Sequence, residues 1–449
     1  MAGIPLRKHS QAQEGLSWLS ILRLGLVQAA LGAIVVLTTS TLNRVMVVEL
    51  GLAAVVPGLL VGLHYGVQFT RPLWGHGSDV GNSRTRWILG GLALLALAGT
   101  GAASTTVLFE QSFVRGLLAA VLAYALIGLG IGASGTSLLA LMASRTAPQR
   151  RAAAATITWM MMIGGIVVTS IISGINLDPY SHERLIAVTA IAGAIAFAIA
   201  TLAVLGIERQ PAVASAQPRD AAGSFRDSFR DVWNDAQARL FTIFVFVSML
   251  AYSTQDLILE PFAGLLFGMT PGQSTALSGT QHGGVFIGMA LVGIFGGRRR
   301  GLLRHFIVSG CLGSAGALLL LSSATAFAPI WPLQANVFLL GLANGAFAVA
   351  AVATMMLLAS GGRRSNEGMR MGVWGAAQAI AFGLGGFMGT AAIDLCRAIT
   401  GDVATSFAIV FAMEAGMFLL SALIALRIGS PLPDRPGMVQ APAPPVAAE

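Results

Sequence analysis

Hydrophobic positions along the chain form long continuous runs, separated by short polar segments. A helix needs about 20 mostly apolar residues to cross the hydrocarbon core of a bilayer. The runs therefore predict an all-α membrane protein with twelve transmembrane helices in two sets of six. The first set covers 24–42, 52–72, 87–107, 117–141, 153–174 and 185–207, and the second covers 241–262, 275–296, 303–327, 333–359, 369–393 and 405–427.

The polar segments divide the chain into four parts. These are 1–207 with the N-terminal tail and first bundle, 208–240 as a cytoplasmic linker, 241–427 as the second bundle, and 428–449 as a tail. The linker is expected to end in an amphipathic helix, where Asp235 and Arg239 have the i, i+4 spacing of an ion pair. The tail is rich in proline and alanine, which predicts disorder.

The composition supports a membrane protein, because 55% of the residues are hydrophobic and only 10% are charged. A net charge of +8 would suggest a nucleic-acid partner in a soluble protein. Here membrane orientation explains it, since positive charge stays in cytoplasmic loops. Only Arg44, Arg115, Arg184 and Arg397 of the 27 Lys and Arg lie in loops expected outside. Both termini are therefore expected in the cytoplasm, and no nucleic acid is expected as a partner.

A short motif follows the second predicted helix. Gly75 and Asp79 form the pattern G-x-x-x-D, and Arg84 and Arg86 come soon after it. Glycine permits close helix approach, and the carboxylate can face a helix N-terminus or pair with an arginine. With the six-plus-six layout, this conformational loop resembles the signature loop of the major facilitator superfamily, whose two halves enclose a central cavity.

Longer stretches place unusual polar residues inside the predicted helices. They read TLNRVMVVELG, TWMMMIGGIVVTSIISG, AYSTQDLILEPFAGLLFG, SGTQHGGVFIGM, GVWGAAQAIAFGLGGFMGT and FAMEAGMFLLSA. In these stretches the chain resembles the PucC-like, or bacteriochlorophyll-delivery, family of the major facilitator superfamily. The resemblance implies a bacterial inner-membrane protein that assists light-harvesting complex assembly. It also implies bacteriochlorophyll or a precursor as ligand, no obligate cofactor, and antenna polypeptides or chlorophyll synthase as partners.

Two carboxylates interrupt the seventh predicted helix. Asp256 and Glu260 are four residues apart and share one helix face, with Gln255 beside them and Pro261 marking a break. An acidic side chain inside a bilayer is costly and is therefore a candidate functional group. The pair is interpreted either as a proton site or polar anchor for a pigment headgroup, or as a buried clasp between the two halves.

Two histidines are candidate pigment ligands. His282 lies beside Gln281 and two glycines in the eighth predicted helix, and His64 has nearly the same position in the second. A neutral imidazole can ligate the magnesium of a chlorin, and adjacent glycines let a flat ring approach the backbone. The alternative is that both histidines are hydrogen-bonded packing residues.

Other polar residues complete the candidate intramembrane site. Gln378 lies in the eleventh predicted helix and Glu414 in the twelfth, which usually lies at the bundle periphery. Glu414 is interpreted as a packing residue, a contact to a partner protein, or a protonated group. Arg44 and Glu49 are expected outside the membrane near the first helical hairpin, as part of an extracytoplasmic gate or as a loop ion pair.

Three functions are consistent with these residues. The favoured one is a pigment-handling assembly factor, because the expected cavity surfaces of the first and fourth predicted helices carry no mid-helix charge, which suits a bulky apolar ligand. These surfaces carry Gln28, Thr38, Thr39, Ser134 and Thr136. The alternatives are a proton-coupled exporter, in which Asp256 or Glu260 would titrate, and a pigment-free scaffold for antenna polypeptides and chlorophyll synthase. The sequence shows no catalytic triad, metal cluster or phosphate loop, so we do not expect an enzyme.

Overall fold

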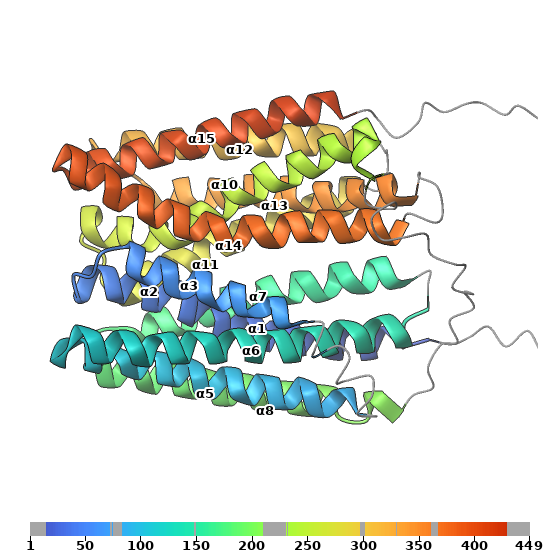
Figure 1. The fold of residues 1–449 in the computed structure, drawn as a ribbon, viewed down its shortest axis with the longest axis horizontal. Coiled ribbons are helices and arrows are strands. Elements are labelled where there is room, and N and C mark those ends of the chain that lie inside the picture. The colour runs from blue at the N-terminus through green and yellow to red at the C-terminus, as the bar shows by residue number, and fades with distance from the viewer. Residues whose placement is uncertain are drawn as a thin grey trace, which may run out of the picture.

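The computed structural model describes residues 15–71, 74, 83–147, 150–209, 230, 232–296, 301–328, 330–360 and 367–428, and these are almost entirely helical (Figure 1). The first half contains α1 (Trp18–Val36), η1 (Leu37–Thr41), α2 (Leu42–Arg44), η2 (Val45–Glu49), α3 (Val55–Val67), η3 (Gln68–Thr70), α5 (Arg84–Gln111), α6 (Phe113–Arg145), α7 (Arg151–Leu177), α8 (His182–Val204) and η5 (Ile207–Arg209). The second half contains α10 (Ala236–Phe267), α11 (Pro271–Gly296), α12 (Gly301–Ala324), α13 (Leu333–Ser360), α14 (Glu367–Thr400) and α15 (Val403–Arg427).

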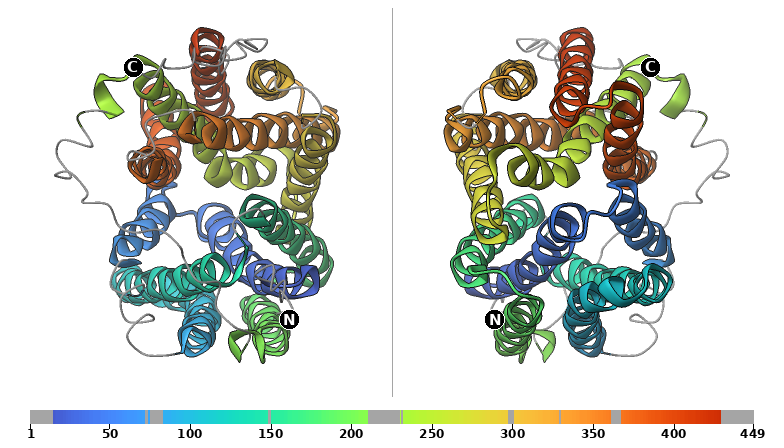
Figure 2. Two further views of the ribbon diagram at one scale, coloured as in Figure 1. Left: turned by 90° about the vertical axis from the view of Figure 1, so that its right-hand side faces the viewer. Right: turned by 90° about the vertical axis from the view of Figure 1, so that its left-hand side faces the viewer.

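The helices form two bundles that lie side by side, as Figure 2 shows in end view. Each bundle has its own buried apolar core. The core of the first half includes Ile21, Leu92 and Leu138. In the second half, the ring of Phe262 packs 5.0 Å from that of Phe411, between α10 and α15. The predicted all-helical fold with two bundles is therefore confirmed.

Among the described residues, ten helices are long and apolar enough to cross a membrane. Two helices fall outside that set. Helix α3 is shorter, and α11 carries several polar side chains, among them Gln281 and His282. Both lie within the bundles beside the long helices (Figure 1). The number of twelve spans thus stays a prediction.

The first span differs from the predicted helix at 24–42. It continues without a break to Glu49 through two π-helical turns, η1 and η2. The loop predicted around Arg44 is therefore wrong, because these residues are helical, whereas their position outside the membrane stays a prediction. The Arg44 side chain is only 2% exposed and pairs with Glu49 inside the structure. Burial against the second half makes helical backbone favourable here, because helix satisfies its own backbone hydrogen bonds.

The second expected helix, 52–72, is shorter in the structure. It begins at Val55 and passes into a 3₁₀ turn that ends at Thr70. Gly75 and Asp79 of the conformational loop lie outside the described residues, as do most of the expected linker 208–240 and the tail from 429 onward.

The expected pair between Asp235 and Arg239 is replaced by other contacts. Asp235 caps the N-terminus of α10, where its carboxylate accepts hydrogen bonds from the N–H groups of Gln237 and Ala238. The same carboxylate pairs with Arg370 of α14 at 2.5 Å. The capping geometry directs the carboxylate toward α14 and away from the next turn of its own helix. Arg239 instead donates to the carbonyl of Trp233.

Candidate functional site

A cavity of about 820 Å³ lies between the two bundles. Residues of α1, α3, α6 and α7 line it from the first half, and residues of α10, α11 and α14 line it from the second. Its volume is within the range of roughly 300 to 1,000 Å³ that is typical of small-molecule sites. We therefore take this cavity as the candidate site.

Six of the predicted site residues line this cavity. They are His64, Asp256, Glu260, Gln281, His282 and Gln378. They come from α3, α10, α11 and α14, so the fold brings together groups that are more than 300 residues apart in sequence. Most of the lining is otherwise apolar, including Met162, Met249 and Met289.

Gln255 and Glu414 do not line the cavity. Both side chains are fully buried inside the second half, and neither the Gln255 amide nor the Glu414 carboxyl has a hydrogen-bond partner among the described residues. Successive residues of a helix are rotated by about 100°, so Gln255 points away from the cavity that Asp256 faces. The structure thus separates these two residues from the group that the sequence placed together.

Glu260 connects the two halves. Its carboxylate accepts a hydrogen bond of 2.6 Å from the hydroxyl of Ser40 in η1 and one of 3.3 Å from the hydroxyl of Ser274 in α11. The side chain is 1% exposed. Of the two interpretations, this geometry corresponds to the clasp between halves.

Asp256 lies one turn earlier on α10 in a different environment. One of its oxygens is buried without a hydrogen-bond partner, and no ion pair to it is found in the described part of the chain. Tyr65 and Tyr252 are near enough to interact with it electrostatically. A buried carboxyl group that lacks a partner is available to a polar group of a bound ligand.

The two histidines have matching hydrogen bonds. His64 Nδ1 lies 2.9 Å from the carbonyl oxygen of Val61, and His282 Nδ1 lies 2.9 Å from that of Ser278. A carbonyl oxygen only accepts, so Nδ1 carries the proton and a neutral ring keeps a free electron pair on Nε2. Histidines that ligate metals in proteins are held in the same way.

The described residues contain no group of three or more His, Cys, Asp or Glu side chains that could hold a metal ion by themselves. Each histidine can therefore supply a single axial ligand to a metal that a larger molecule carries. Gln281 adds a buried amide nitrogen without a hydrogen-bond partner in the lining. The donor set fits a flat metallated ring better than a free ion.

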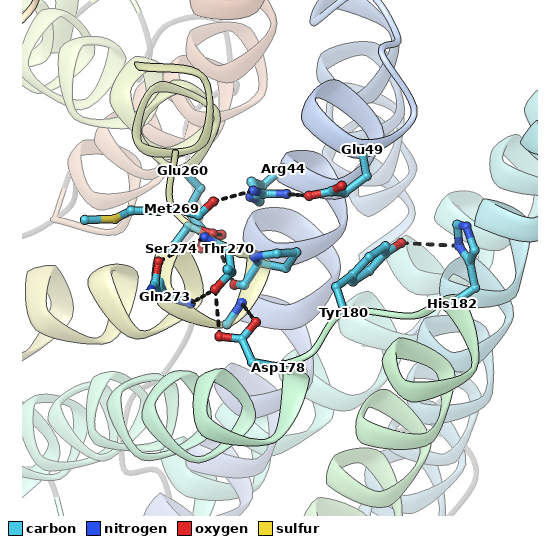
Figure 3. Close-up of polar contacts among 12 residues, drawn as sticks. Arg44, Glu49, Asp178, Tyr180, His182, Glu260, Met269, Thr270, Gln273 and Ser274 are labelled. Carbon is cyan, nitrogen blue, oxygen red and sulfur yellow. Dashed lines mark hydrogen bonds and ion pairs between the residues drawn. The ribbon is translucent and has the colours of Figure 1, made fainter. Parts of the chain in front are cut away.

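Helix α1 starts and helix α15 ends at the same end of the molecule. At the opposite end, contacts between the two halves hold the structure shut, and we call it the closed end. Figure 3 shows that Arg44 lies at its centre. Its guanidinium donates to the carbonyl of Met269 in the second half at 2.6 Å and pairs with Glu49 in its own half. Nearby, the hydroxyls of Thr41 and Thr275 are 3.1 Å apart.

Two carboxylates at the closed end cap helices of the opposite half. Asp178, at the end of α7, accepts hydrogen bonds from the Thr270 hydroxyl at 2.7 Å and the Gly272 N–H at 3.3 Å, at the start of α11 (Figure 3). Asp394 of α14 accepts from the N–H groups of Ala54 and Val55, at the start of α3. Carboxylates at helix N-termini are favourable because orphan N–H groups point toward them.

The two described arginines of the conformational loop lie away from the cavity. Arg84 donates to the carbonyl of Ala140 on α6 at 2.9 Å, and its backbone N–H donates to Glu208 at 2.6 Å. Arg86 is exposed. Arg84 therefore joins the start of α5 to α6 and to η5 within the first half.

Sequence reasoning did not identify Tyr65, Tyr252 and Arg71, which line the cavity, or Asp178 and Asp394 at the closed end. A signal existed for the two carboxylates. Asp178 directly follows a long apolar run, and Asp394 directly follows the eleventh predicted span, which contains no acidic residue. No comparable signal marks the tyrosines, because an aromatic ring inside an apolar run is also compatible with ordinary helix packing.

Comparison with known proteins gives two kinds of match. A sequence profile described as PUCC protein matches residues 41–431. The chain is 54% identical to the bacteriochlorophyll synthase 44.5 kDa chain of Rhodobacter capsulatus, over 92% of this chain and 96% of that protein. It is 28% identical to Protein PucC of Cereibacter sphaeroides, over 93% of each. The structure resembles the crystal structure of D-xylose-proton symporter with a TM-score of 0.69 and 14% identity, over 92% and 98% of the two chains, which shows a shared major facilitator fold.

Proposed function

The chain belongs to the PucC family, and from this premise we propose that it is a membrane assembly factor that holds bacteriochlorophyll or a precursor in its central cavity. It would deliver the pigment to light-harvesting or other photosynthetic complexes. The name of the relative from Rhodobacter capsulatus connects that protein with bacteriochlorophyll, and the fold is that of membrane transporters.

The observation that carries the proposal is the pair of histidines in the cavity. Both rings have Nδ1 bonded to a carbonyl of their own helix, which leaves Nε2 available. His64 and His282 come from α3 and α11, one in each half, and both line the same cavity. A bound pigment would supply a magnesium ion that accepts one axial nitrogen.

The other polar residues would orient the ring. The Gln281 amide nitrogen, which lacks a hydrogen-bond partner, can donate to a carbonyl or ester oxygen at the ring edge. The Asp256 carboxyl can donate to such an oxygen in its protonated form. The apolar lining would exclude water, which competes with imidazole for magnesium. No residue in this arrangement breaks or forms a covalent bond, so we propose a carrier and not an enzyme.

The setting of the protein forms part of the proposal. We place it in the bacterial inner membrane with both termini in the cytoplasm, because Arg115, Arg184 and Arg397 lie at the closed end, away from most basic residues. Antenna polypeptides and chlorophyll synthase are the proposed partners, since a pigment carrier must receive its ligand and pass it on.

A proton-coupled exporter is the second candidate. The unpaired Asp256 carboxyl in the cavity favours it, because such a group can take up and release a proton during transport. A pigment-free scaffold would need neither the cavity histidines nor Asp256.

The proposal is tested by purifying the protein in mild detergent from a photosynthetic host and recording its absorption spectrum. Wild-type protein is expected to carry pigment. His282→Ala is expected to lower pigment per protein several-fold, because one axial bond is lost while apolar contacts remain. His282→Phe fills the volume but cannot ligate, so it is expected to stay low as well.

His182→Ala is the matched control, since His182 bonds to Thr106 and Glu110 outside the cavity. This variant is expected to retain wild-type pigment. Full occupancy and an unchanged spectrum in His282→Phe would show that the histidine only packs. Wild-type protein that never carries pigment would support the scaffold or the exporter instead.

A further inference from the structure

The two halves meet along two pairs of neighbouring helices, which we call seams. The two seams differ in how closely their helices pack. One seam is formed by α3 and α14. A Cβ atom added at Gly58 would lie 2.0 Å from the Thr390 hydroxyl oxygen, so the helices touch near the closed end. At Gly62 the nearest atom would be the Gly383 carbonyl oxygen at 3.8 Å, and at Gly66 nothing lies within 4 Å. Helices α3 and α14 therefore diverge away from the closed end.

Small residues form both sides of this diverging seam. Gly62 and Gly66 on α3 face the cavity, as do Gly375 and Gly383 on α14. A Cβ added at Gly375 would meet nothing within 4 Å, and one at Gly383 would make only ordinary contact with Tyr65. No bulky side chain from these four positions fills the space between the helices.

The seam between α7 and α11 is closed in a different way. Ile163, Val285 and Met289 form a buried cluster there, exposed by 4%, 1% and 3%. Trp159 and Ile166 pack against that cluster from α7. Figure 2 shows the two seams on opposite sides of the molecule. Side chains thus fill the α7–α11 seam. The α3–α14 seam has glycines on both helices, and the rings of Tyr65 and Phe382 lie across it with their centroids 6.3 Å apart.

Polar and apolar side chains both line the cavity along its length, and Gln68, Arg71 and Gln378 lie away from the closed end. Glu260 and Ser278 lie toward the closed end, and the histidines and Asp256 follow. Away from the closed end the lining includes Leu139, Ile380 and Leu384, with exposures of 49%, 44% and 42%. Ile380 and Leu384 belong to α14, one of the two helices of the α3–α14 seam, and their exposed apolar side chains suit an apolar chain that leaves the cavity there.

We propose that the α3–α14 seam is a lateral portal for the long isoprenoid tail of a bound tetrapyrrole. The ring stays in the cavity, and the tail extends between the glycines into the surrounding lipid. This inference rests on the proposed function, because it assigns a path to one part of the same ligand. The histidines would bind the ring, and the seam would accommodate the tail.

The test compares two pigments that differ only in the tail. Purified protein in lipid nanodiscs is titrated with bacteriochlorophyll a and with the methyl ester of its tailless form. Gly66→Leu and Gly383→Leu, one on each helix of the seam, are expected to weaken binding of the tailed pigment by about tenfold. Binding of the methyl ester is expected to stay within about twofold of wild type.

Gly283→Leu is the matched control, because a Cβ added at Gly283 on α11 also meets nothing within 4 Å and this glycine does not line the cavity. It is expected to bind both pigments as wild type does. Equal losses for both pigments in the seam variants, or no loss for either, would overturn the portal while leaving the proposed function intact. If wild-type protein binds neither pigment, the proposed function fails and the portal fails with it.

Discussion

At the scale of single residues, Asp256 and Glu260 show how one turn of helix separates two roles. Glu260 accepts hydrogen bonds from hydroxyls of η1 and α11, so it joins the halves. Asp256 faces the cavity with one oxygen that lacks a partner. The hydroxyl donors, rather than the carboxyl groups themselves, account for the difference.

The Ser40 hydroxyl is expected to stabilise the closed arrangement through Glu260. Ser40→Ala removes a buried donor at 2.6 Å and leaves the carboxylate with one partner fewer. Such a loss costs about 1–3 kcal/mol. The variant is expected to unfold at a lower temperature than wild type, as measured by a thermal shift in detergent.

Ser137→Ala provides the control for this substitution. Ser137 is also fully buried, yet its hydroxyl has no hydrogen-bond partner among the described residues. Its removal is expected to leave the unfolding temperature nearly unchanged. Equal effects of the two substitutions would show that the bond between Ser40 and Glu260 contributes nothing measurable.

The sequence predicts candidate polar residues better than it predicts their partners. Six of the eight intramembrane candidates line the cavity, because polar side chains inside apolar runs are conspicuous. Gln255 and Glu414 are equally conspicuous but lie in the packing of the second half. Helical rotation separates Gln255 from its neighbour, and only tertiary packing determines which helix face meets the cavity.

At the scale of elements, hydropathy identifies the helices but misplaces the end of the first. Residues 37–41 and 45–49 form π-helical turns that carry the span on to Glu49. π-Turns are rare and often lie near functional sites. Here they place Ser40 and Arg44 against the second half. Hydropathy cannot predict this extension, since contacts with distant helices compensate the buried polar groups.

The N-terminus of α5 is stabilised by a carboxylate from another element. Glu208 accepts hydrogen bonds from the N–H groups of Arg84 at 2.6 Å and Thr85 at 3.1 Å. Burial alone would raise the pKa of Glu208, but the bonds from Thr85, Arg84 and Ser83 outweigh it and hold the pKa below its usual range. The ionised form of Glu208 is thus the form that binds this helix end.

This shift predicts a dependence of stability on pH. A carboxyl whose pKa is lowered by folding stabilises the protein above its unfolded pKa of about 4.3, and the contribution is lost as pH falls through the folded value. Glu208→Gln is expected to lower the unfolding temperature near neutral pH. The difference from wild type should shrink as pH falls below about 4.

The control is Glu183→Gln, which changes an exposed carboxylate in the first turn of α8. It is expected to have little effect across the same pH range. A difference between wild type and Glu208→Gln that stays constant from neutral to acidic pH would contradict the assigned role of the ionised carboxylate.

At the scale of the whole molecule, the closed end has a two-fold pattern. Asp178 at the end of α7 caps α11 of the other half, and Asp394 near the end of α14 caps α3 of the first. With the first span counted from Trp18 to Glu49, α3 and α11 are the second main helices of their halves, and α7 and α14 are the fifth. Hydropathy predicts two repeats of six helices. The same repeat also relates the Asp178 carboxylate to the Asp394 carboxylate.

This pattern was only partly predictable. The apolar runs predict two bundles, and the basic residues predict which ends lie together. The pairing of Asp178 with α11 depends on how the two halves meet, which no local pattern describes. Sequence therefore predicts the halves, whereas the structure is needed to place the contacts between them.

Each cap is expected to bias the molecule toward the conformation with this end shut. Asp178→Ala and Asp394→Ala each remove a helix cap worth about 1 kcal/mol. Each single variant should therefore raise the population opened at this end about fivefold, and the double variant roughly 30-fold. The measurement uses Thr275→Cys, a fully buried position, with Cys311 and Cys396 replaced by serine. The rate of labelling by a membrane-impermeant maleimide reports the opened population.

Asp402→Ala distinguishes closure between halves from helix capping in general. Asp402 caps α15 with a bond of 2.7 Å to the Thr405 N–H, at the same end of the molecule but within its own half. Its loss weakens a helix end without touching a contact between bundles, so labelling at Thr275→Cys should stay at the wild-type rate. If Asp402→Ala speeds labelling as much as Asp178→Ala does, the caps act on local helix stability alone. A double variant no faster than either single would mean that the two caps are not independent.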